Sequence, residues 1–372
     1  ASTAGAVTVG KVIQNRENVH PGTYLGKGKI EEVKELLWEL DATGIICDDE
    51  LSPAQLKNLE DALDTKVMDR TMVILDIFAS RARTREGKIQ VELAQLRYRA
   101  VRLVGLRNSL SRLGGGIGTR GPGEKKLEVD RRLIHERISQ LKSELEDVKR
   151  HREVVRKKRE NGGALTAAIV GYTNAGKSTL LNRLTQAGIL AEDKLFATLD
   201  PTTRALTLPG GERVLLTDTV GFIRKLPHHL IEAFKSTLEE AKYSDVILHV
   251  VDCSNPQMDM QMHVVYETLR QLEITDKEIV TVFNKIDREG ADTAGRDMAA
   301  DYRVKISAKT GEGLPDLLGV LETILRSRRI YFEKVFSYAE AGRIQRIRKN
   351  GRLLSEEYKE DGIHVTAYVP VE

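Results

Sequence analysis

One short segment constrains the fold of this 372-residue chain more than any other. Residues 171–178 read GYTNAGKS, and the apolar run LTAAIV (165–170) leads directly into them. In this pattern the glycines let backbone N–H groups converge on phosphates, while the lysine reaches phosphate oxygens and the serine hydroxyl binds Mg²⁺. Because such a loop joins a buried strand to the first turn of a helix, it predicts an α/β domain with a largely parallel sheet.

Two further segments predict the rest of a phosphate and metal site. Asp218 ends the apolar strand in LLTDTVG (215–221), where it would hold Mg²⁺ through water and the Gly221 N–H would meet a γ-phosphate. The polar loop FATLDPTTR (196–204) lies between the two motifs, and Thr198 would give Mg²⁺ a second hydroxyl only when the γ-phosphate is present. For this loop alone, an ordinary turn is the alternative interpretation.

The segments at 284–287 and 307–313 predict selectivity for guanine. NKID (284–287) ends an apolar strand, and the Asp287 carboxylate would accept hydrogen bonds from the N1–H and the exocyclic amine of guanine, which adenine lacks. SAKTGEG (307–313) supplies residues suited to backing the base. Four motifs in this order predict a G domain, here residues 162–329, that binds GTP and hydrolyses it to GDP.

The residue after DTVG departs from the Ras-like pattern. Many GTPases place there a glutamine that orients the attacking water, whereas this chain has Phe222. A phenyl ring cannot orient water by hydrogen bonding, so intrinsic hydrolysis should be slow and depend on a partner, an added cation, or both. Asn174 lies where potassium-stimulated GTPases with this hydrophobic substitution carry a cation-coordinating asparagine, which makes K⁺ a hypothetical cofactor beside Mg²⁺.

A basic, helix-forming segment precedes the G domain. Residues 97–160 carry 19 lysines and arginines against nine aspartates and glutamates, although the whole chain has a net charge of only +3. A solvated charged face is the alternative, but so large an excess favours a polyanionic partner. Apolar residues at three-four spacing predict an antiparallel helical hairpin over 85–161. They are Leu93, Leu96, Ala100, Leu103, Leu110 and Leu113, then Leu127, Ile134, Ile138, Leu141, Leu145 and Val148.

The glycine-rich segment GGGIGTRGPG (114–123) forms the predicted hairpin tip. Gly116, Gly118 and Gly121 match the G-x-G-x-x-G pattern of dinucleotide sites. That pattern needs a preceding strand, and here a helix precedes it, so a dinucleotide site is excluded. We expect Arg120 and the nearby lysines Lys125 and Lys126 to contact nucleic-acid phosphates instead.

The two ends of the chain predict smaller domains. Residues 1–84 alternate strand-like and helical runs, which predicts an N-terminal α/β domain: AVTVGKVI, KIEEVKELLWEL, GIICDD, SPAQLKNLEDAL, KVMDR and TMVILDIFAS. GKGK (26–29) suits a plain turn or an RNA phosphate contact better than a nucleotide site, because no Walker A pattern surrounds it. Residues 330–372 predict a small C-terminal α/β module. The expected fold class is therefore multidomain α/β with a P-loop GTPase domain.

Composition limits the location of the protein. The longest apolar runs are far shorter than the roughly 18 residues of a membrane span, and no charged, then apolar, secretory pattern begins the chain. Cys47 and Cys253 are interpreted as buried reduced thiols rather than as a disulfide or metal site. We therefore expect a cytoplasmic protein without stable membrane insertion.

Together these motifs resemble the HflX family of translational GTPases over essentially the whole chain. The resemblance rests on GYTNAGKSTLLNRL, FATLDPT, DTVGFIRKLPHHL, LDIFASRARTREGKIQVELAQL and GTRGPGEKKLEVDRR. It implies binding to the large ribosomal subunit and its rRNA near the peptidyl transferase centre, GTP-dependent dissociation of stalled or idle ribosomes, ribosome-stimulated hydrolysis, and a monomer when free. Against this family, we expect the chain to begin inside the first domain, without that domain's first strand.

The resemblance also implies which residues contact the nucleotide. Lys177, Thr198 and Gly221 would act on the reacting phosphate, and Ser178 and Thr198 would bind Mg²⁺. The full set is Gly171, Tyr172, Thr173, Asn174, Ala175, Gly176, Lys177 and Ser178; Phe196, Ala197, Thr198, Leu199 and Asp200; Asp218, Thr219, Val220 and Gly221; Asn284, Lys285, Ile286 and Asp287; and Ser307, Ala308 and Lys309.

A second function from a different class also fits the sequence. The chain would then be a nucleotide-gated factor that binds RNA, protein or membrane through its basic hairpin, with incidental hydrolysis. Binding to purified ribosomal subunits, compared between a non-hydrolysable GTP analogue and GDP, separates the two hypotheses.

Overall fold

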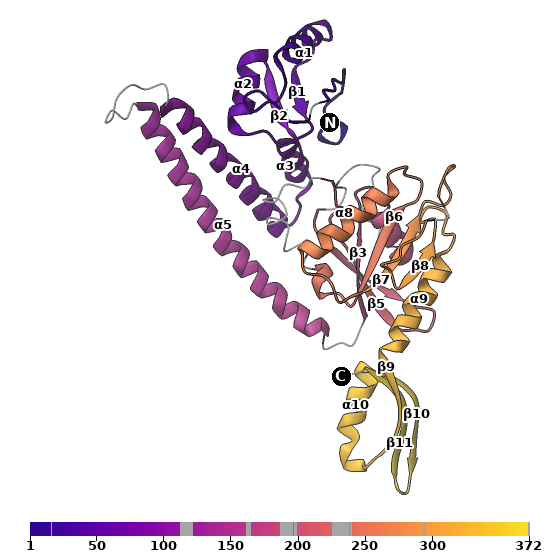
Figure 1. The fold of residues 1–372 in the computed structure, drawn as a ribbon. Helices are drawn as coiled ribbons and strands as arrows, with labels where there is room; N and C mark the ends of the chain where they lie inside the picture. The colour runs from indigo at the N-terminus through magenta and orange to yellow at the C-terminus, as the bar shows by residue number, and fades with distance from the viewer. Residues whose placement is uncertain are drawn as a thin grey trace. The chain divides into compact units, whose positions relative to one another are not determined.

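The computed structural model describes residues 1–15, 17–111, 122–160, 165–186, 196, 199–224, 238, 240–292 and 295–370. The chain forms two compact units, one over Ala1–Asp147 and the other over Val148–Arg224 and Lys235–Glu372. Figure 1 shows the order of the elements in each.

The N-terminal part of the first unit is a small α/β fold. Its two strands pair in parallel, with Gly44 opposite Lys66 and Cys47 opposite Asp69. Ser52 caps the second helix, since its side chain accepts from the Gln55 N–H while the Gln55 side chain bonds back to the Ser52 N–H. The elements are η1 (Ser2–Ala4), α1 (Lys27–Glu39), β1 (Gly44–Cys47), α2 (Pro53–Leu63), β2 (Lys66–Asp69) and α3 (Arg70–Arg81).

The run at 6–13 is not the strand that its alternating valines predict. The structure describes these residues without regular secondary structure, and the side chains of Val7, Val9 and Ile13 are 87%, 54% and 63% exposed. A strand is stabilised by hydrogen bonds to a neighbouring strand and by burial of one face. This run has no strand partner, because β1 pairs only with β2 in the described sheet, and although Val12 packs against the N-terminal core, the other apolar side chains named here do not form a buried face.

Two long helices follow, α4 (Arg85–Ser111) and α5 (Pro122–Glu160). They pack through a single apolar cluster of Ile89, Leu93, Ile138, Leu141 and Leu145, with Leu96 and Ile134 beside it. The guanidinium of Arg137 adds a bidentate pair to the Glu92 carboxylate, at 2.8 and 3.1 Å. These contacts lie along the stripes that predicted the hairpin. Of the expected tip at 114–123, residues 114–121 lie outside the described part, as do the side chains of Lys125 and Lys126, and the last two tip residues begin α5.

The second unit is built on a six-stranded sheet in the order β4-β5-β3-β6-β7-β8. All pairs are parallel except β4 with β5. The strands are β3 (Leu165–Gly171), β4 (Thr202–Thr207), β5 (Arg213–Asp218), β6 (Val246–Asp252), β7 (Glu278–Asn284) and β8 (Tyr302–Lys305), and the helices are α6 (Lys177–Thr185), α8 (Met258–Gln271) and α9 (Leu314–Ser327).

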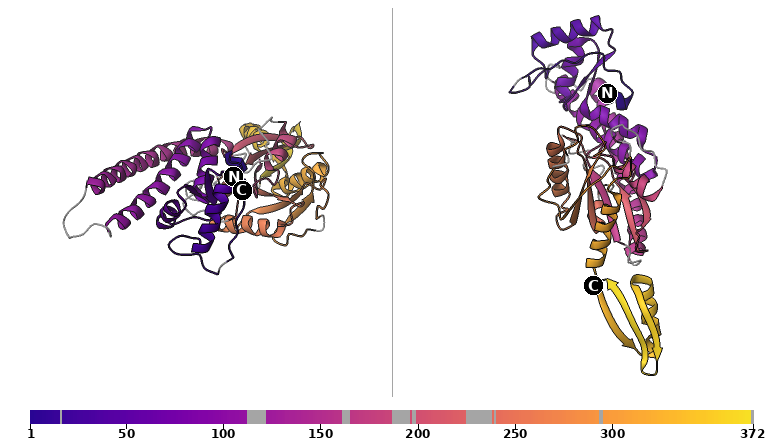
Figure 2. Two further views of the ribbon diagram at one scale, coloured as in Figure 1. Left: turned by 90° about the horizontal axis from the view of Figure 1, so that it is seen from above. Right: turned by 90° about the vertical axis from the view of Figure 1, so that its right-hand side faces the viewer.

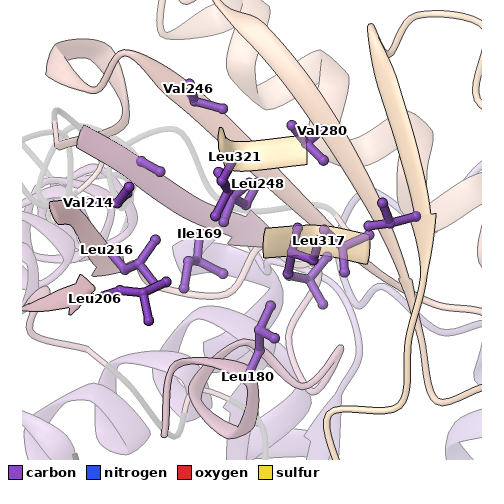
Figure 3. Close-up of a cluster of buried hydrophobic side chains, with 14 of the residues drawn as sticks. Ile169, Leu180, Leu206, Val214, Leu216, Val246, Leu248, Val280, Leu317 and Leu321 are labelled. Carbon is purple, nitrogen blue, oxygen red and sulfur yellow. The ribbon is translucent and has the colours of Figure 1, made fainter. Parts of the chain in front are cut away.

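Both faces of this sheet are covered. Leu180 of α6 and Leu317 of α9 pack against Ile169, Leu216 and Leu248 on one face, as Figure 3 shows. On the opposite face, α8 packs Met258 and Met262 against Val251 and Phe283. Successive side chains of a strand point to opposite faces, so β6 contributes to both cores. This is why its sequence is almost continuously apolar.

The C-terminal residues form a three-stranded antiparallel sheet in the order β10-β11-β9, with one helix on it. Ile344 of the helix packs with Phe336, Ile363, Val365 and Ala367, and Figures 1 and 2 show the helix lying along one face. The elements are β9 (Arg329–Phe336), η2 (Tyr338–Glu340), α10 (Ala341–Asn350), β10 (Arg352–Lys359) and β11 (Gly362–Pro370).

Two general features were also expected. In the described segments, no helix has the length and apolar character that a bilayer crossing requires. Cys47 and Cys253 are both buried free thiols. Burial raises the pKa of Cys47 to about 11 and also raises that of Cys253, so neither is a reactive thiolate at neutral pH.

Candidate functional site

The phosphate loop sits at the carboxyl end of β3, the central strand. Two positions of the loop accommodate only glycine. A Cβ on Gly171 would lie 2.3 Å from the carbonyl oxygen of Val250, and one on Gly176 would lie 2.2 Å from Nδ2 of Asn284. Gly171 and Gly176 also have positive φ angles of 156° and 99°, a region that L side chains avoid. The loop is therefore packed tightly against the carboxyl ends of β6, the neighbour of β3, and of β7, the next strand in the sheet.

Lys177 lies folded back over this loop. Its Nζ donates to the carbonyl oxygens of Gly171 and Tyr172, at 3.2 and 3.1 Å, and the residue is only 6% exposed. The pKa of Lys177 is lowered to about 8, mainly by burial; the Asp218 carboxylate opposes this shift and the Lys285 ammonium adds a smaller lowering. A buried ammonium that donates to two carbonyl oxygens is well prepared to receive an anionic ligand.

Ser178 and Asp218 lie together beside Lys177. The Ser178 hydroxyl donates to Oδ2 of Asp218 at 2.7 Å, although the two residues come from α6 and β5. Mg²⁺ prefers oxygen donors and usually takes only one or two protein ligands together with phosphates and water, and this pair supplies such donors. Elsewhere in the described residues, no cluster of three or more His, Cys, Asp and Glu could hold a metal ion.

Thr173 connects the phosphate loop to the two flanking motifs. Its N–H donates to the carbonyl of Phe222 at 2.7 Å, and the Phe222 N–H donates to the carbonyl of Gly171 at 3.1 Å. Its hydroxyl accepts from the Phe196 N–H at 2.9 Å. Both phenyl rings are buried, and Phe196 has a positive φ of 55°. The expected contacts at Ala197 and Thr198 lie outside the described residues.

The remaining predicted residues of this half lie close by. A Cβ on Gly221 would lie 2.7 Å from Cα of Thr173 and 3.0 Å from Nζ of Lys177, so only glycine lets the DTVG backbone reach the loop. The Thr219 hydroxyl donates to the carbonyl of Ile169 at 2.8 Å. Leu199 and Val220 are buried, and Asp200 is half-buried.

The NKID and SAK segments form the other half of the site. Asn284 donates through Nδ2 to the carbonyl of Ala175 and accepts through Oδ1 from the Ala308 N–H, at 2.8 and 2.9 Å. The Ser307 hydroxyl donates to Oδ1 of Asp287 at 2.7 Å, and this bond lowers the pKa of the Asp287 carboxyl. Asp287 and Lys309 are exposed. Ile286 is half-buried against the cluster under α8.

One residue of this site was missed from the sequence. Asp252, the last residue of β6, accepts from Nζ of Lys285 at 2.6 Å, and the same Nζ donates to the carbonyl of Asn174 at 2.7 Å. A signal was present, because a carboxylate at the carboxyl end of the apolar run VILHVVD faces the edge of the sheet that carries the phosphate loop.

The described motif residues thus meet at one edge of one sheet, and the fold with this site defines a P-loop GTPase, an enzyme that hydrolyses GTP. Family models agree along the chain: residues 1–79 match "GTP-binding GTPase N-terminal", 81–159 match "GTP-binding GTPase Middle Region", and 166–285 match "50S ribosome-binding GTPase". Relatives that match over the whole chain are GTPases named HflX. The chain therefore belongs to the HflX family.

The relatives cover nearly the whole chain. GTPase HflX of Lacrimispora saccharolytica is 79% identical over 370 residues, covering 100% of this chain and 88% of its own. GTPase HflX of Caldanaerobacter subterraneus subsp. tengcongensis is 50% identical over 372 residues, covering 100% and 86%. A crystal structure of a GTP-binding protein from Sulfolobus solfataricus with GDP is 24% identical with a TM-score of 0.47, covering 87% of this chain and 92% of that one.

Proposed function

We propose that the protein binds the large ribosomal subunit in its GTP state, dissociates stalled or idle ribosomes into subunits, and is released after hydrolysis. The observation that carries the proposal is one chain that combines the GTPase site with a long basic hairpin. The matching family model is described as a ribosome-binding GTPase, and the relatives share the full length of the chain. We further propose that the free protein is a monomer.

The proposal assigns a role to each residue of the phosphate half. Lys177 neutralises phosphate charge, Ser178 and Thr198 bind Mg²⁺, and Asp218 orients the metal's water shell. When bound, Mg²⁺ would supply positive charge that stabilises the negative charge of the phosphates. The Gly221 N–H donates to the γ-phosphate, so that loss of this phosphate frees the DTVG segment.

The hairpin supplies the electrostatic part of ribosome binding. Arg131, Arg132 and Lys142 are exposed on α5, and Arg132 is paired only loosely with Glu136 at 3.4 Å on the surface. Exposed lysines and arginines bind nucleic-acid phosphates with a strong salt dependence. Aromatic residues are scarce in this segment, so phosphate attraction rather than base stacking should dominate.

Sedimentation of intact ribosomes mixed with the protein tests the proposal. With GTP or a non-hydrolysable analogue and Mg²⁺, we expect 70S particles to decrease, free subunits to increase, and the protein to migrate with the large subunit. With GDP, it should remain at the top of the gradient. Binding without subunit release would reject the dissociation step, and absence from both subunits in every nucleotide state would favour a nucleotide-gated factor with another partner.

A further inference from the structure

Asp252 occupies a central place in the GTPase site although no nucleotide-binding motif includes it. It ends β6 and lies directly opposite Asn284, the last residue of β7, in the register of the parallel pair. The Cys253 N–H and thiol both donate to the carbonyl of Asn284, at 3.1 and 2.8 Å. The carboxyl ends of these two neighbouring strands are therefore closely joined.

The carboxylate of Asp252 is held in one orientation. Its Oδ1 accepts from the N–H and the hydroxyl of Ser254, at 3.0 and 2.6 Å. Its Oδ2 is thereby directed at Nζ of Lys285, 2.6 Å away. The two side chains are only 11% and 12% exposed, so the charges are largely removed from water and attract each other more strongly than a surface pair would.

Lys285 extends this contact to the phosphate loop. Its Nζ also donates to the carbonyl of Asn174, and its backbone adopts a positive φ of 68°. The adjacent Asn284 donates to the carbonyl of Ala175. Two successive residues of NKID thus donate hydrogen bonds to two successive carbonyls of the phosphate loop. Asp252 fixes the side chain of Lys285, which makes one of these two bonds.

We propose that Asp252 is a positioning residue for nucleotide binding. By fixing Lys285, it holds the base-recognition segment against the phosphate loop, so that the base and the phosphates of one nucleotide are bound by a single preformed unit. The inference rests on the proposed guanine recognition by NKID. It adds that affinity depends on a carboxylate that contacts neither the base nor the phosphates.

The test compares release of a fluorescent GDP from the full-length protein and from the Asp252→Asn variant. Asparagine keeps the size and the Ser254 hydrogen bonds but loses the charge that fixes Lys285. Because removing one partner of a buried ion pair is strongly destabilising, the base-recognition segment should loosen and GDP release should be about tenfold or more faster. The maximal hydrolysis rate at saturating GTP should stay within about twofold of the wild-type rate. An interaction that holds the nucleotide equally in the ground state and the transition state affects KM rather than kcat.

Three variants separate positioning from general damage. Asp245→Asn makes the same change just before the start of β6, at the end of the strand remote from Asp252. Asp245 forms an ion pair with Arg328 and accepts a hydrogen bond from the Thr166 N–H. This variant should leave GDP release unchanged. Ser254→Ala keeps the carboxylate but removes one orienting donor, so release should accelerate less than with Asp252→Asn. Combined with Lys285→Gln, Asp252→Asn should add almost nothing, since the two act through one contact.

The outcomes separate this inference from the proposed function. If the wild-type protein bound guanine and adenine nucleotides equally well, guanine recognition by NKID would fail. If the wild-type protein were guanine-selective but Asp252→Asn released GDP at the wild-type rate, or if its effect added fully to that of Lys285→Gln, the positioning role alone would be wrong. A folded Ser254→Ala variant decides the matter should Asp252→Asn not fold.

Discussion

At the scale of single residues, the site divides into positions that a sequence pattern specifies and positions that only packing reveals. The need for glycine at 171, 176 and 221 follows from atoms of other residues that lie within 3 Å of the missing Cβ, backbone atoms at 171 and 221 and the Asn284 amide at 176. The motif pattern already placed glycine at these positions. The role of Thr173 could not be predicted, because its partners Phe196 and Phe222 approach it only in the folded sheet.

The buried lysine of the phosphate loop should make nucleotide affinity depend on pH. Burial brings the pKa of Lys177 to about 8, and a bound polyphosphate would raise it. Below pH 8 the ammonium is already formed and affinity should be level. Above it, binding must first take up a proton, so GDP affinity should weaken by up to about tenfold per pH unit. Titration calorimetry between pH 6.5 and 9.5 measures this.

Lys177→Arg is the matched comparison for this pH dependence. Its guanidinium stays charged throughout the range, so its affinity should be weaker overall but lose the fall above pH 8. Other titrating groups, including the base itself, are common to both proteins. Parallel pH profiles of the two proteins would contradict the assignment.

The exposed carboxylate of NKID should determine which base is bound. Asp287→Asn replaces two acceptors by an acceptor and a donor, which suits xanthine better than guanine. GTP affinity should fall about 100-fold or more, because a site built for a hydrogen-bonded group discriminates strongly, and xanthosine triphosphate affinity should rise. Competition binding with both nucleotides is the measurement. Unchanged GTP affinity would mean that Asp287 does not contact the base.

The buried Phe222 and the exposed Asn174 together predict dependence on a monovalent cation. Phe222 cannot orient water, and Asn174 has a positive φ of 65° at the rim of the phosphate loop. We propose K⁺ as the additional cation, so hydrolysis without ribosomes should be faster in potassium chloride than in sodium chloride at equal ionic strength. Asn174→Ala should abolish the difference. Equal rates for the wild-type protein in both salts would refute the potassium hypothesis.

At the scale of helices and strands, apolar periodicity predicted those elements whose apolar side chains pack locally against a neighbour. The runs at 165–170 and 246–252 became β3 and β6. Part of each leucine stripe became the packed faces of α4 and α5, namely Leu93 and Leu96 with Ile134, Ile138, Leu141 and Leu145. The failure at 6–13 has the opposite cause. Alternating valines are compatible with a strand, but strand formation depends on a partner that the sequence does not identify.

The hairpin should be sensitive to cavities in its apolar seam. Leu141 is 1% exposed between α4 and α5, and Leu141→Ala should cost about 2–5 kcal/mol locally. Amide hydrogen exchange in α4 should accelerate, while exchange in β3 stays unchanged. Leu133→Ala is the matched control, since Leu133 is 53% exposed on the same helix. Equal exchange in the two variants would show that the arms do not stabilise each other.

At the scale of the whole molecule, the sequence predicted the family and the kind of each part. The boundaries proposed at 84, 161 and 329 remain predictions, although family models change at 79–81 and 159–166. The contacts of these parts with one another could not be predicted from motifs, because motifs encode local geometry. Asp252 illustrates the limit within one domain, since its partner Lys285 directly follows a different strand, β7.

Removing charge from the hairpin tip should weaken ribosome binding in a salt-dependent way. Alanine at Arg120, Lys125 and Lys126 together should reduce the slope of log affinity against log salt by about 2 to 3, one unit for each lost phosphate contact. Ribosome-stimulated hydrolysis should fall, while intrinsic hydrolysis stays unchanged. Alanine at Lys27, Lys34 and Lys66 removes the same charge from the N-terminal part. If both triple variants bound equally well, the tip would not be the contact.

The order of the strands along the chain also determines when the nucleotide site can form during synthesis of the protein. Gly171 packs against Val250, and the phosphate loop is gripped by Asn284, which in turn needs Ala308. A nascent chain that has emerged only through the GKS sequence therefore has a hairpin but no nucleotide site. Because translation adds about 5–20 residues per second, several seconds pass between the synthesis of the GKS sequence and that of Ala308. Each new copy emerges as an incomplete, inactive factor and becomes able to bind nucleotide only when its last β-α unit has left the exit tunnel.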